Sequence, residues 1–252
     1  MPETVKVARA LRAWWRTERK TERPAARFSK LIALLWEFLL GSLPRARRER
    51  YGDIDYDWEH RFDTTSATVS WRTRLVGLLN TPYQPIPPDE FRQMMEALSL
   101  DFSSFTFIDA GSGKGRALLL ASEYNFRRIV GIELDPELAR IARENVNQLY
   151  SRRPSGETSP KIEKIELVSG DARDFAFPNE PSVLFLFNPL PEPSLRELVR
   201  NLTASLELNP RPFYVAYANP VLEHVFEGLA VLKKTRGTAQ YSLFGPVSRE
   251  VN

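Results

Sequence analysis

A run of small and acidic residues, placed between an apolar stretch and a helix-like stretch, is the part of this sequence best suited to chemistry. Phe107-Ile108-Asp109-Ala110 is apolar apart from its acid, and alternate glycines follow it. Glycine lets the backbone adopt positive φ and approach a ligand closely. Free N–H groups at the start of the next helix attract an anion such as a carboxylate. The pattern predicts a loop that binds a nucleoside cofactor bearing a carboxylate, with these candidate contacts: Asp109, Gly111, Ser112, Gly113 and Gly115.

Two phosphate-binding motifs fit this run poorly. The dinucleotide fingerprint G-x-G-x-x-G requires a glycine where Arg116 stands. The P-loop motif requires Ser or Thr after its lysine, but Gly115 follows Lys114, and no glycine lies five residues before Gly113. These mismatches disfavour dinucleotides and nucleoside triphosphates. For the loop taken alone, a glycine-rich turn without a ligand stays an alternative.

Two further acids follow the next two apolar runs. The predicted strand Arg128–Glu133 ends at Glu133, 24 residues after Asp109. This is close to the interval of about 20 residues at which α/β nucleoside sites place a carboxylate against ribose hydroxyls. After the predicted strand Ile165–Val168 come Asp171 and Ala172, where Asp171 can accept a hydrogen bond from an adenine amino group. Alone, each acid also fits a helix cap or a solvated strand end. Because ligands of open α/β sheets bind at the carboxyl ends of strands, we expect the acids to converge on one cofactor.

Together these residues resemble the class I, seven-stranded S-adenosylmethionine-dependent methyltransferases over about residues 80–250. The resemblance implies that S-adenosylmethionine is the cofactor and S-adenosylhomocysteine the product. It also implies that the cofactor is held by the glycine loop with Asp109, by Glu133, and by Asp171 with Ala172. It specifies the cofactor class and leaves the acceptor open.

The flanks resemble a narrower group, the non-SET lysine methyltransferases related to the disruptor-of-telomeric-silencing enzymes and their bacterial relatives. The features are Tyr83-Gln84-Pro85-Ile86-Pro87-Pro88 before the predicted helix Phe91–Leu98, and Asn188-Pro189-Leu190-Pro191 after the predicted strand Ser182–Phe187. This resemblance implies that Tyr83 covers the cofactor and that Asn188 lines the transfer site, beside both cofactor and acceptor. A rigid surface loop is the alternative for Tyr83 and its prolines.

Asn188 also resembles the first residue of the [DN]-P-P-[YF] motif of enzymes that methylate base amines or glutamine amides. Leu190 and Pro191 replace the second proline and the aromatic residue that would stack on a flipped base, so nucleic acid is the weaker alternative. Methyl transfer to an amine depends on alignment of donor and acceptor more than on a strong acid or nucleophile. This matches a chain with no cysteine and only His60 and His224, which could hardly form a zinc site or a thiol nucleophile.

The acidic run Asp53, Asp55 and Asp57 matches the start of a calcium-binding loop. Trp58 and Thr64 stand where that motif needs glycine and glutamate, so we expect no metal site.

To hold the candidate residues at one edge, the chain must form an α/β sheet. We predict a Rossmann-like, doubly wound, mostly parallel seven-stranded sheet with an N-terminal helical extension. The predicted strands are Phe105–Ala110, Arg128–Glu133, Ile165–Val168, Ser182–Phe187, Phe213–Tyr217, Val231–Thr235 and Gln240–Phe244. Helices are predicted at Ser194–Leu206 and Val221–Leu229. A hairpin through Arg236-Gly237-Thr238 would make one strand antiparallel.

The length of 252 residues allows one α/β domain with an extension. We expect a basic helical extension over residues 1–50, a lid or substrate-side segment over 51–100, and the cofactor-binding domain over 101–252. Residues 1–50 carry 13 Lys or Arg against 5 acids, whereas the rest carries 22 against 27. The apolar stretch Leu31–Leu40 is shorter than the roughly 20 residues that span a bilayer. A packed helix, a membrane-surface helix and a nucleic-acid arm all fit this extension.

No cleavable signal pattern and no cysteine are found, which favours the cytoplasm, either free or peripheral to a membrane. The whole pattern predicts a methyltransferase that uses S-adenosylmethionine on a nitrogen acceptor, either a protein lysine or a small amine. Two alternatives stay open. One is a non-catalytic cofactor-binding adaptor at a membrane surface, and the other is a nucleic-acid methyltransferase.

Overall fold

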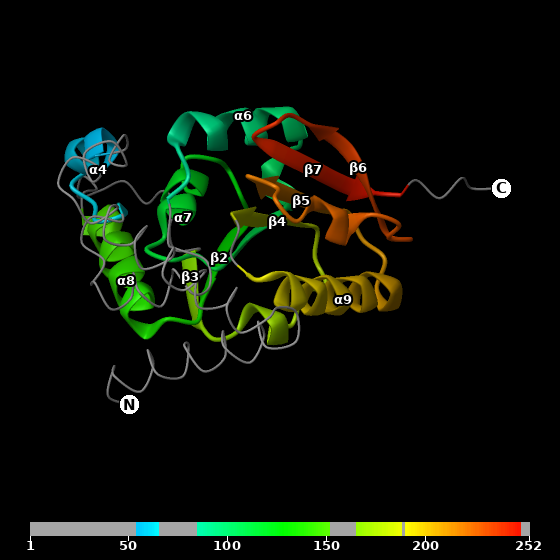
Figure 1. Cartoon of the computed structure of the whole chain (residues 1–252). Coiled ribbons are helices and arrows are strands. Elements are labelled where there is room, and N and C mark those ends of the chain that lie inside the picture. The colour runs from blue at the N-terminus through cyan, green and yellow to red at the C-terminus, as the bar shows by residue number, and fades with distance from the viewer. Residues whose placement is uncertain (1–53, 66–84, 152–164, 188–189, 248–252) are drawn as a thin grey trace, which may run out of the picture. The chain divides into compact units, whose positions relative to one another are not determined.

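The computed structural model describes residues 54–65, 85–151, 165–187 and 190–247 (Figure 1). The chain divides into two compact units, one made of residues 1–61 with 65–84 and the other of residues 62–64 with 85–252. In the first unit the described residues form the helix α4 (Ile54–His60) and its flank. The basic extension 1–50, Tyr83 and Asn188 lie outside the described residues.

The second unit is built on one seven-stranded sheet in the order β3-β2-β1-β4-β5-β7-β6. Its strands are β1 (Thr106–Ala110), β2 (Arg128–Glu133), β3 (Ile165–Ser169), β4 (Ser182–Phe187), β5 (Phe213–Ala218), β6 (Leu232–Gly237) and β7 (Tyr241–Pro246). Neighbouring strands from β3 to β5 run parallel, and β7 is antiparallel to both β5 and β6. The sheet is Rossmann-like, seven-stranded and mostly parallel, so the predicted fold class is confirmed.

Four α-helices of the second unit are described: α6 (Pro88–Leu98), α7 (Arg116–Ala121), α8 (Pro136–Ser151) and α9 (Glu192–Leu208). Short 3₁₀ helices are η2 (Phe102–Ser104), η3 (Ala172–Asp174) and η4 (Glu223–Phe226). The start of α8 is capped by Asp135, whose Oδ1 accepts from the Glu137 N–H at 2.8 Å, and Pro136 is the first helical residue.

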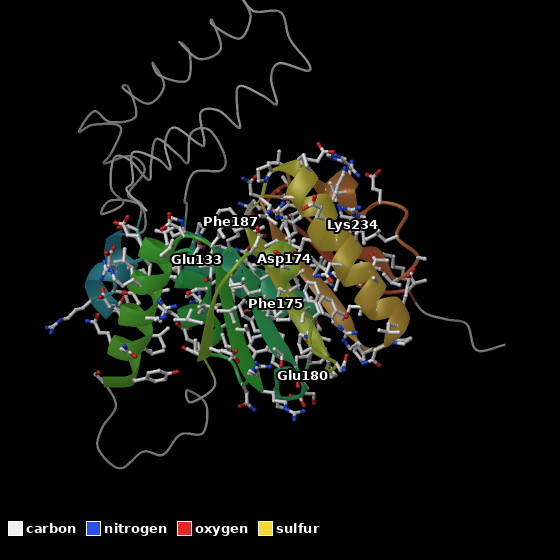
Figure 2. All side chains as sticks on the ribbon, turned by 90° about the horizontal axis from the view of Figure 1, so that it is seen from below. Glu133, Asp174, Phe175, Glu180, Phe187 and Lys234 are labelled. Atoms are coloured by element: carbon white, nitrogen blue, oxygen red, sulfur yellow. The ribbon has the colours of Figure 1, made fainter. Side chains whose placement is uncertain are left out.

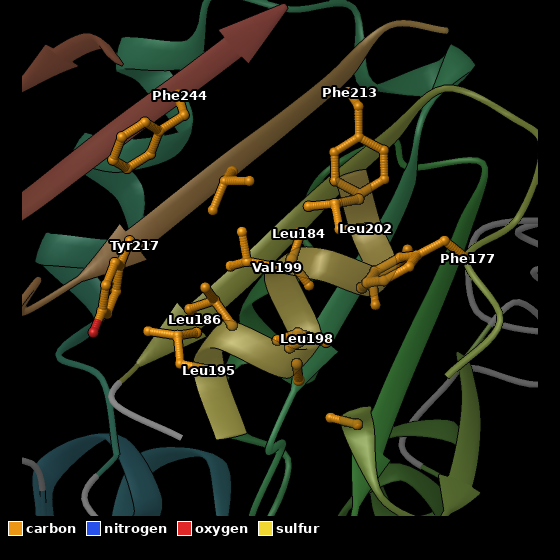
Figure 3. Close-up of a cluster of buried hydrophobic side chains, with 14 of the residues drawn as sticks. Phe177, Leu184, Leu186, Leu195, Leu198, Val199, Leu202, Phe213, Tyr217 and Phe244 are labelled. Carbon is orange, nitrogen blue, oxygen red and sulfur yellow. The ribbon is translucent and has the colours of Figure 1, made fainter. Parts of the chain in front are cut away.

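Helices cover both faces of the sheet, because side chains alternate along its central strands. On one face, Phe107 of β1 and Phe185 of β4 pack against Phe91 of α6. On the other, Leu184 and Leu186 belong to a buried cluster with the apolar face of α9 (Figure 3). The α9 residues in that cluster are Leu195, Leu198, Val199, Leu202 and Leu206. These two packed clusters hold the sheet in place, and with it the edge at which the carboxyl ends of the parallel strands lie.

One predicted helix is wrong. Over Val221–Leu229 the structure has only the four-residue η4. The chain leaves β5 through Asn219 at φ +45°, and Gly228 has φ +71°, so left-handed residues bracket the segment. Between these two residues the chain forms a single short 3₁₀ segment in place of the predicted helix.

The outermost strand on one side of the sheet is β6, which pairs only with β7 among the described strands. Only Leu232 of this strand is buried, and the exposed residues include Lys233, Lys234 and Arg236. Its pairing with β7 shifts register between Lys234 and Arg236.

Candidate functional site

The loop after β1 is shaped by three glycines in left-handed conformations. Gly111, Gly113 and Gly115 have φ of +85°, +55° and +84°. The N–H groups of Gly111 and Ser112 both donate to the Ile132 carbonyl at 2.9 Å, and that of Gly115 donates to the Ser112 carbonyl at 2.8 Å. These amides hold the turn against β2. The N–H groups predicted to bind a ligand carboxylate are those at the start of the next helix, and these three loop amides are used within the chain.

Glu133 joins the glycine loop to the end of β2. Its Oε2 accepts from the Gly113 N–H at 2.8 Å, and its Oε1 accepts from the Asp135 N–H at 2.7 Å. Burial raises the pKa of this carboxyl, and the two N–H donors oppose that rise. The sequence placed Glu133 and the glycine loop at one strand edge, and the hydrogen bond to Gly113 brings them together.

Asp109 is the buried acid of this site. It is 3% exposed and lies inside the sheet, where β1 pairs it with Gly131 of β2 and Phe185 of β4. Burial raises its pKa well above the ordinary range, and repulsion from the Glu133 carboxylate raises it further. The pKa of both carboxyls is raised, and a cation beside them would favour their ionised forms.

Burial of Asp109 leads to a prediction about pH. Because the folded pKa is raised, the native state binds more protons than the unfolded chain at pH values above the ordinary pKa of about 3.9. Stability from this carboxyl therefore falls as the pH rises through that window. Asp109→Asn should be more stable than the unsubstituted protein, and its advantage should grow from pH 5 to pH 8 in urea unfolding measured by circular dichroism.

The difference between the two unfolding curves isolates Asp109. Burial also raises the pKa of Glu133, so a single curve mixes the effects of two carboxyls. An advantage of Asp109→Asn that stays constant over this range would contradict a buried, titrating carboxyl.

Asp171 lies just after β3 and caps η3. Its Oδ1 accepts from the Arg173 N–H at 3.0 Å, and both carboxylate oxygens accept from the Arg173 guanidinium, the closest pair being Nη2 and Oδ2 at 2.7 Å. Hydrogen bonding from Arg173 lowers the pKa of Asp171. Arg173 also donates to Glu197 of α9 at 2.9 Å, while Ala172 is buried in the core cluster. The carboxylate of Asp171 is therefore ionised and held in one orientation.

Two features at this edge, Arg173 and Leu134, were missed from the sequence, and the predicted contact Ser112 adds a third observation. Arg173 orients Asp171, and the run Gly170-Asp171-Ala172-Arg173 was a usable signal because a cation two residues after an acid can pair with it. Leu134 is 66% exposed beside Glu133, an apolar side chain on which a flat ring can lie. Ser112 Oγ is buried and has no hydrogen-bond partner in the described part of the chain, as expected where a water or ligand completes a site.

The edge itself is visible in Figure 2, where Glu133 and Phe187, the last residues of β2 and β4, lie on one side of the sheet. Glu180, which precedes β4, lies on the opposite side. Because β1, β2 and β3 are parallel neighbours, their carboxyl ends, which carry or precede the candidate acids, meet at this same edge.

Both histidines and Asp57 of the calcium-like run lie in ordinary local contacts, and Asp53 lies outside the described residues. His60 Nδ1 is 3.0 Å from the Tyr56 carbonyl, and His224 Nε2 is 3.1 Å from Glu192 Oε1. Asp57 Oδ2 accepts from the Thr65 N–H at 2.7 Å. Among the described residues, no group of three side chains is placed to hold a metal ion. None of the helices in those same ranges is long and apolar enough to cross a membrane.

Comparison with known proteins gives one curated relative of note. A release factor glutamine methyltransferase of Vibrio cholerae is 40% identical over 73 residues, which cover 27% of this chain and 25% of the relative. The chain thus matches about a quarter of the length of that enzyme. No family model matches the chain.

Solved structures of several methyltransferases are similar in outline. An RNA methyltransferase from Salinibacter ruber in complex with S-adenosyl-L-homocysteine is 21% identical with a TM-score of 0.42, covering 67% of this chain and 97% of that one. A predicted N6-adenine-specific DNA methylase from Listeria monocytogenes is 16% identical with a TM-score of 0.49, covering 75% and 55%. Because these sequence identities and TM-scores are low, the assignment of the fold rests on the strand order of this chain.

Proposed function

We propose that this chain is a methyltransferase that binds S-adenosylmethionine at the edge formed by β1, β2 and β3. The observation that carries the proposal is the hydrogen bond from the Gly113 N–H to Glu133, because it joins the glycine loop and the acid after β2 into one site. Glu133 is the proposed acceptor for the ribose hydroxyls. Asp109 is the proposed partner of the cationic methionine end, and Asp171 of the adenine amino group.

The acceptor side of the proposal rests on the sequence after β4. This strand ends at Phe187, at the same edge as Glu133, and Asn188 is the next residue (Figure 2). We assign Asn188 to the transfer site and Tyr83 to a covering role over the cofactor. A side-chain amide oxygen next to a carbonyl fixed by proline can hold an N–H group in line with the methyl carbon.

The proposed acceptor is nitrogen, in a protein lysine or a small amine. Its lone pair attacks the methyl carbon, the carbon–sulfur bond breaks, S-adenosylhomocysteine leaves, and the nitrogen loses a proton to solvent. The protein supplies alignment and excludes water, and the sulfonium supplies the driving force. The Vibrio cholerae relative is named as a glutamine methyltransferase. Glutamine carries a side-chain amide nitrogen, so this name supports a nitrogen acceptor.

Two measurements test the proposal in order. Calorimetry should give a dissociation constant for S-adenosylmethionine between about 1 μM and 1 mM, the usual range for enzyme substrates. Incubation with methyl-labelled cofactor and fractionated cell extract should then move label into a protein or small-amine fraction, with acid-stable N-methyl groups.

Each outcome separates one alternative. Absence of cofactor binding would overturn the proposal as a whole. Label in nucleic acid would overturn the acceptor class alone. Binding without any transfer, together with liposome binding carried by residues 1–50, would support the membrane-surface adaptor instead.

A further inference from the structure

Two cations of the glycine loop have a role that the proposed function does not explain. Lys114 and Arg116 stand on either side of Gly115 and are only 0% and 2% exposed. A cation out of water is costly unless it is paired and hydrogen-bonded. Both also lie at the start of α7, where the helix dipole disfavours positive charge. Their burial therefore calls for specific partners.

Those partners come from residues about 50 positions upstream in the sequence. Lys114 Nζ donates to Asp63 Oδ1 at 2.7 Å. The Arg116 Nε–H donates to the hydroxyl of Thr64, which is itself fully buried. The Asp63 side chain is 39% exposed, so this ion pair is open to water on one side only. The pairing also removes Lys114 from any phosphate-binding role.

A third element closes the arrangement. Asn145 of α8 is buried, and its Nδ2 donates to the carbonyls of Asp63 at 2.9 Å and Lys114 at 3.0 Å. Its Oδ1 accepts from the Asp63 N–H at 2.9 Å. One amide side chain thus ties the upstream residues, the glycine loop and α8 together. We call this set of residues the clamp: Asp63, Thr64, Lys114, Arg116 and Asn145.

The clamp and Glu133 hold the same short stretch of loop from two sides. Glu133 accepts from the N–H of Gly113, and Asn145 donates to the carbonyl of Lys114. Gly113 and Gly115, on either side of Lys114, have positive φ. An unrestrained glycine-rich chain populates many other backbone conformations as well. Fixing the stretch in advance lowers the entropy that a bound ligand would otherwise lose in ordering it.

We propose that the clamp positions the cofactor loop, so that cofactor affinity depends on Asp63 and Thr64, which precede the sheet in the sequence. Asp63, Thr64 and Asn145 are positioning residues, acting through the backbone of Gly113 and Lys114. The inference rests on the proposed function. It adds an upstream determinant of affinity for the same site.

The test uses a matched pair at Thr64 in the full chain. Thr64→Ser keeps the hydroxyl that Arg116 donates to, whereas Thr64→Val keeps the shape and removes it. By calorimetry, Thr64→Ser should bind S-adenosylmethionine within about twofold of the unsubstituted protein, and Thr64→Val about tenfold more weakly, the scale of coupling carried by such networks. Glu166→Gln is the control, because it removes an ion-pair partner of Arg128 at β3, away from the clamp, and should leave affinity unchanged.

A double-mutant cycle adds a readout that lost stability alone would not produce. Asp63→Asn and Lys114→Met should each weaken binding about tenfold, and the double variant should weaken it by much less than the product of the two effects. Amide hydrogen exchange of residues 111–115 should be about tenfold faster in Thr64→Val, with β5 unchanged.

The failures of the two proposals can be told apart. If the unsubstituted protein binds cofactor and Thr64→Val binds it equally well with unchanged loop exchange, the clamp is overturned and the proposed function stands. If nothing binds but loop exchange still responds to Thr64→Val, the clamp orders the loop and the cofactor assignment is wrong, which overturns the affinity role. Should Lys114→Met fail to fold, the Thr64 pair decides the question alone.

Discussion

Replacement of Glu133 by Gln is expected to weaken binding of S-adenosylmethionine about a hundredfold. Both carboxylate oxygens accept from backbone N–H groups, those of Gly113 and Asp135. A glutamine has only one oxygen, so its NH₂ group must face one of the two donors. Lost hydrogen bonds to a charged group are worth about 1.5–3 kcal/mol each, and 1.4 kcal/mol corresponds to a factor of ten.

Calorimetry measures the affinity of Glu133→Gln, and thermal unfolding shows whether the variant is folded at the temperature used. Glu144→Gln is the matched control, since that glutamate pairs with Arg140 on the exposed side of α8. Its affinity should equal that of the unsubstituted protein. A Glu133→Gln variant that binds within threefold would remove the assignment of this residue to the ribose.

Substitution of Gly115 by Ala should lower the stability of the fold more than substitution of Gly228 by Ala. Gly115 has φ +84°, which costs a residue with a side chain about 1–2 kcal/mol. A Cβ there would also lie 3.3 Å from Ala142 Cβ in α8, and overpacking in a filled interior adds about 1 kcal/mol or more. We expect Gly115→Ala to lower the free energy of unfolding by about 2–3 kcal/mol in urea titrations.

Gly228 provides the control for this experiment. Its φ is +71°, but a Cβ at that position would meet nothing within 4 Å. Gly228→Ala therefore carries the backbone cost alone, about 1 kcal/mol. Equal losses in the two variants would mean that α8 moves to accept the added methyl group, contrary to a loop packed tightly against that helix.

The strands could be predicted because their signals are local. The apolar run of β4 was placed at Ser182–Phe187, which are its bounds in the structure. The α9 helix was predicted at Ser194–Leu206 and spans Glu192–Leu208, since its apolar spacing is clear but its ends are not. In the last hairpin the turn falls later than predicted. The Thr238 hydroxyl accepts from the N–H groups of Gln240 and Tyr241, which fixes the turn after Gly237.

The candidate site was predictable only where two conditions were met: a residue of suitable chemical type, and a position at the end of a predicted strand. Glu133 and the glycine loop met both conditions, and the structure joins them. The partners of Lys114 and Arg116 were not predictable, because a contact between residues about 50 positions apart leaves no periodic trace in one sequence. The spacing of Asp171 and Arg173 allows an ion pair, but the two-oxygen contact that Arg173 makes depends on the side-chain rotamers around η3.

The outermost strand bears on how copies of this chain behave at high concentration. A sheet that ends in an open strand can recruit another chain's strand and grow into aggregates. In β6 that outcome is opposed by repulsion between the exposed side chains of Lys233 and Arg236 on facing copies. The register shift between Lys234 and Arg236 also interrupts the regular ladder that an incoming strand would need. We therefore expect intermolecular sheet growth to be blocked at this border.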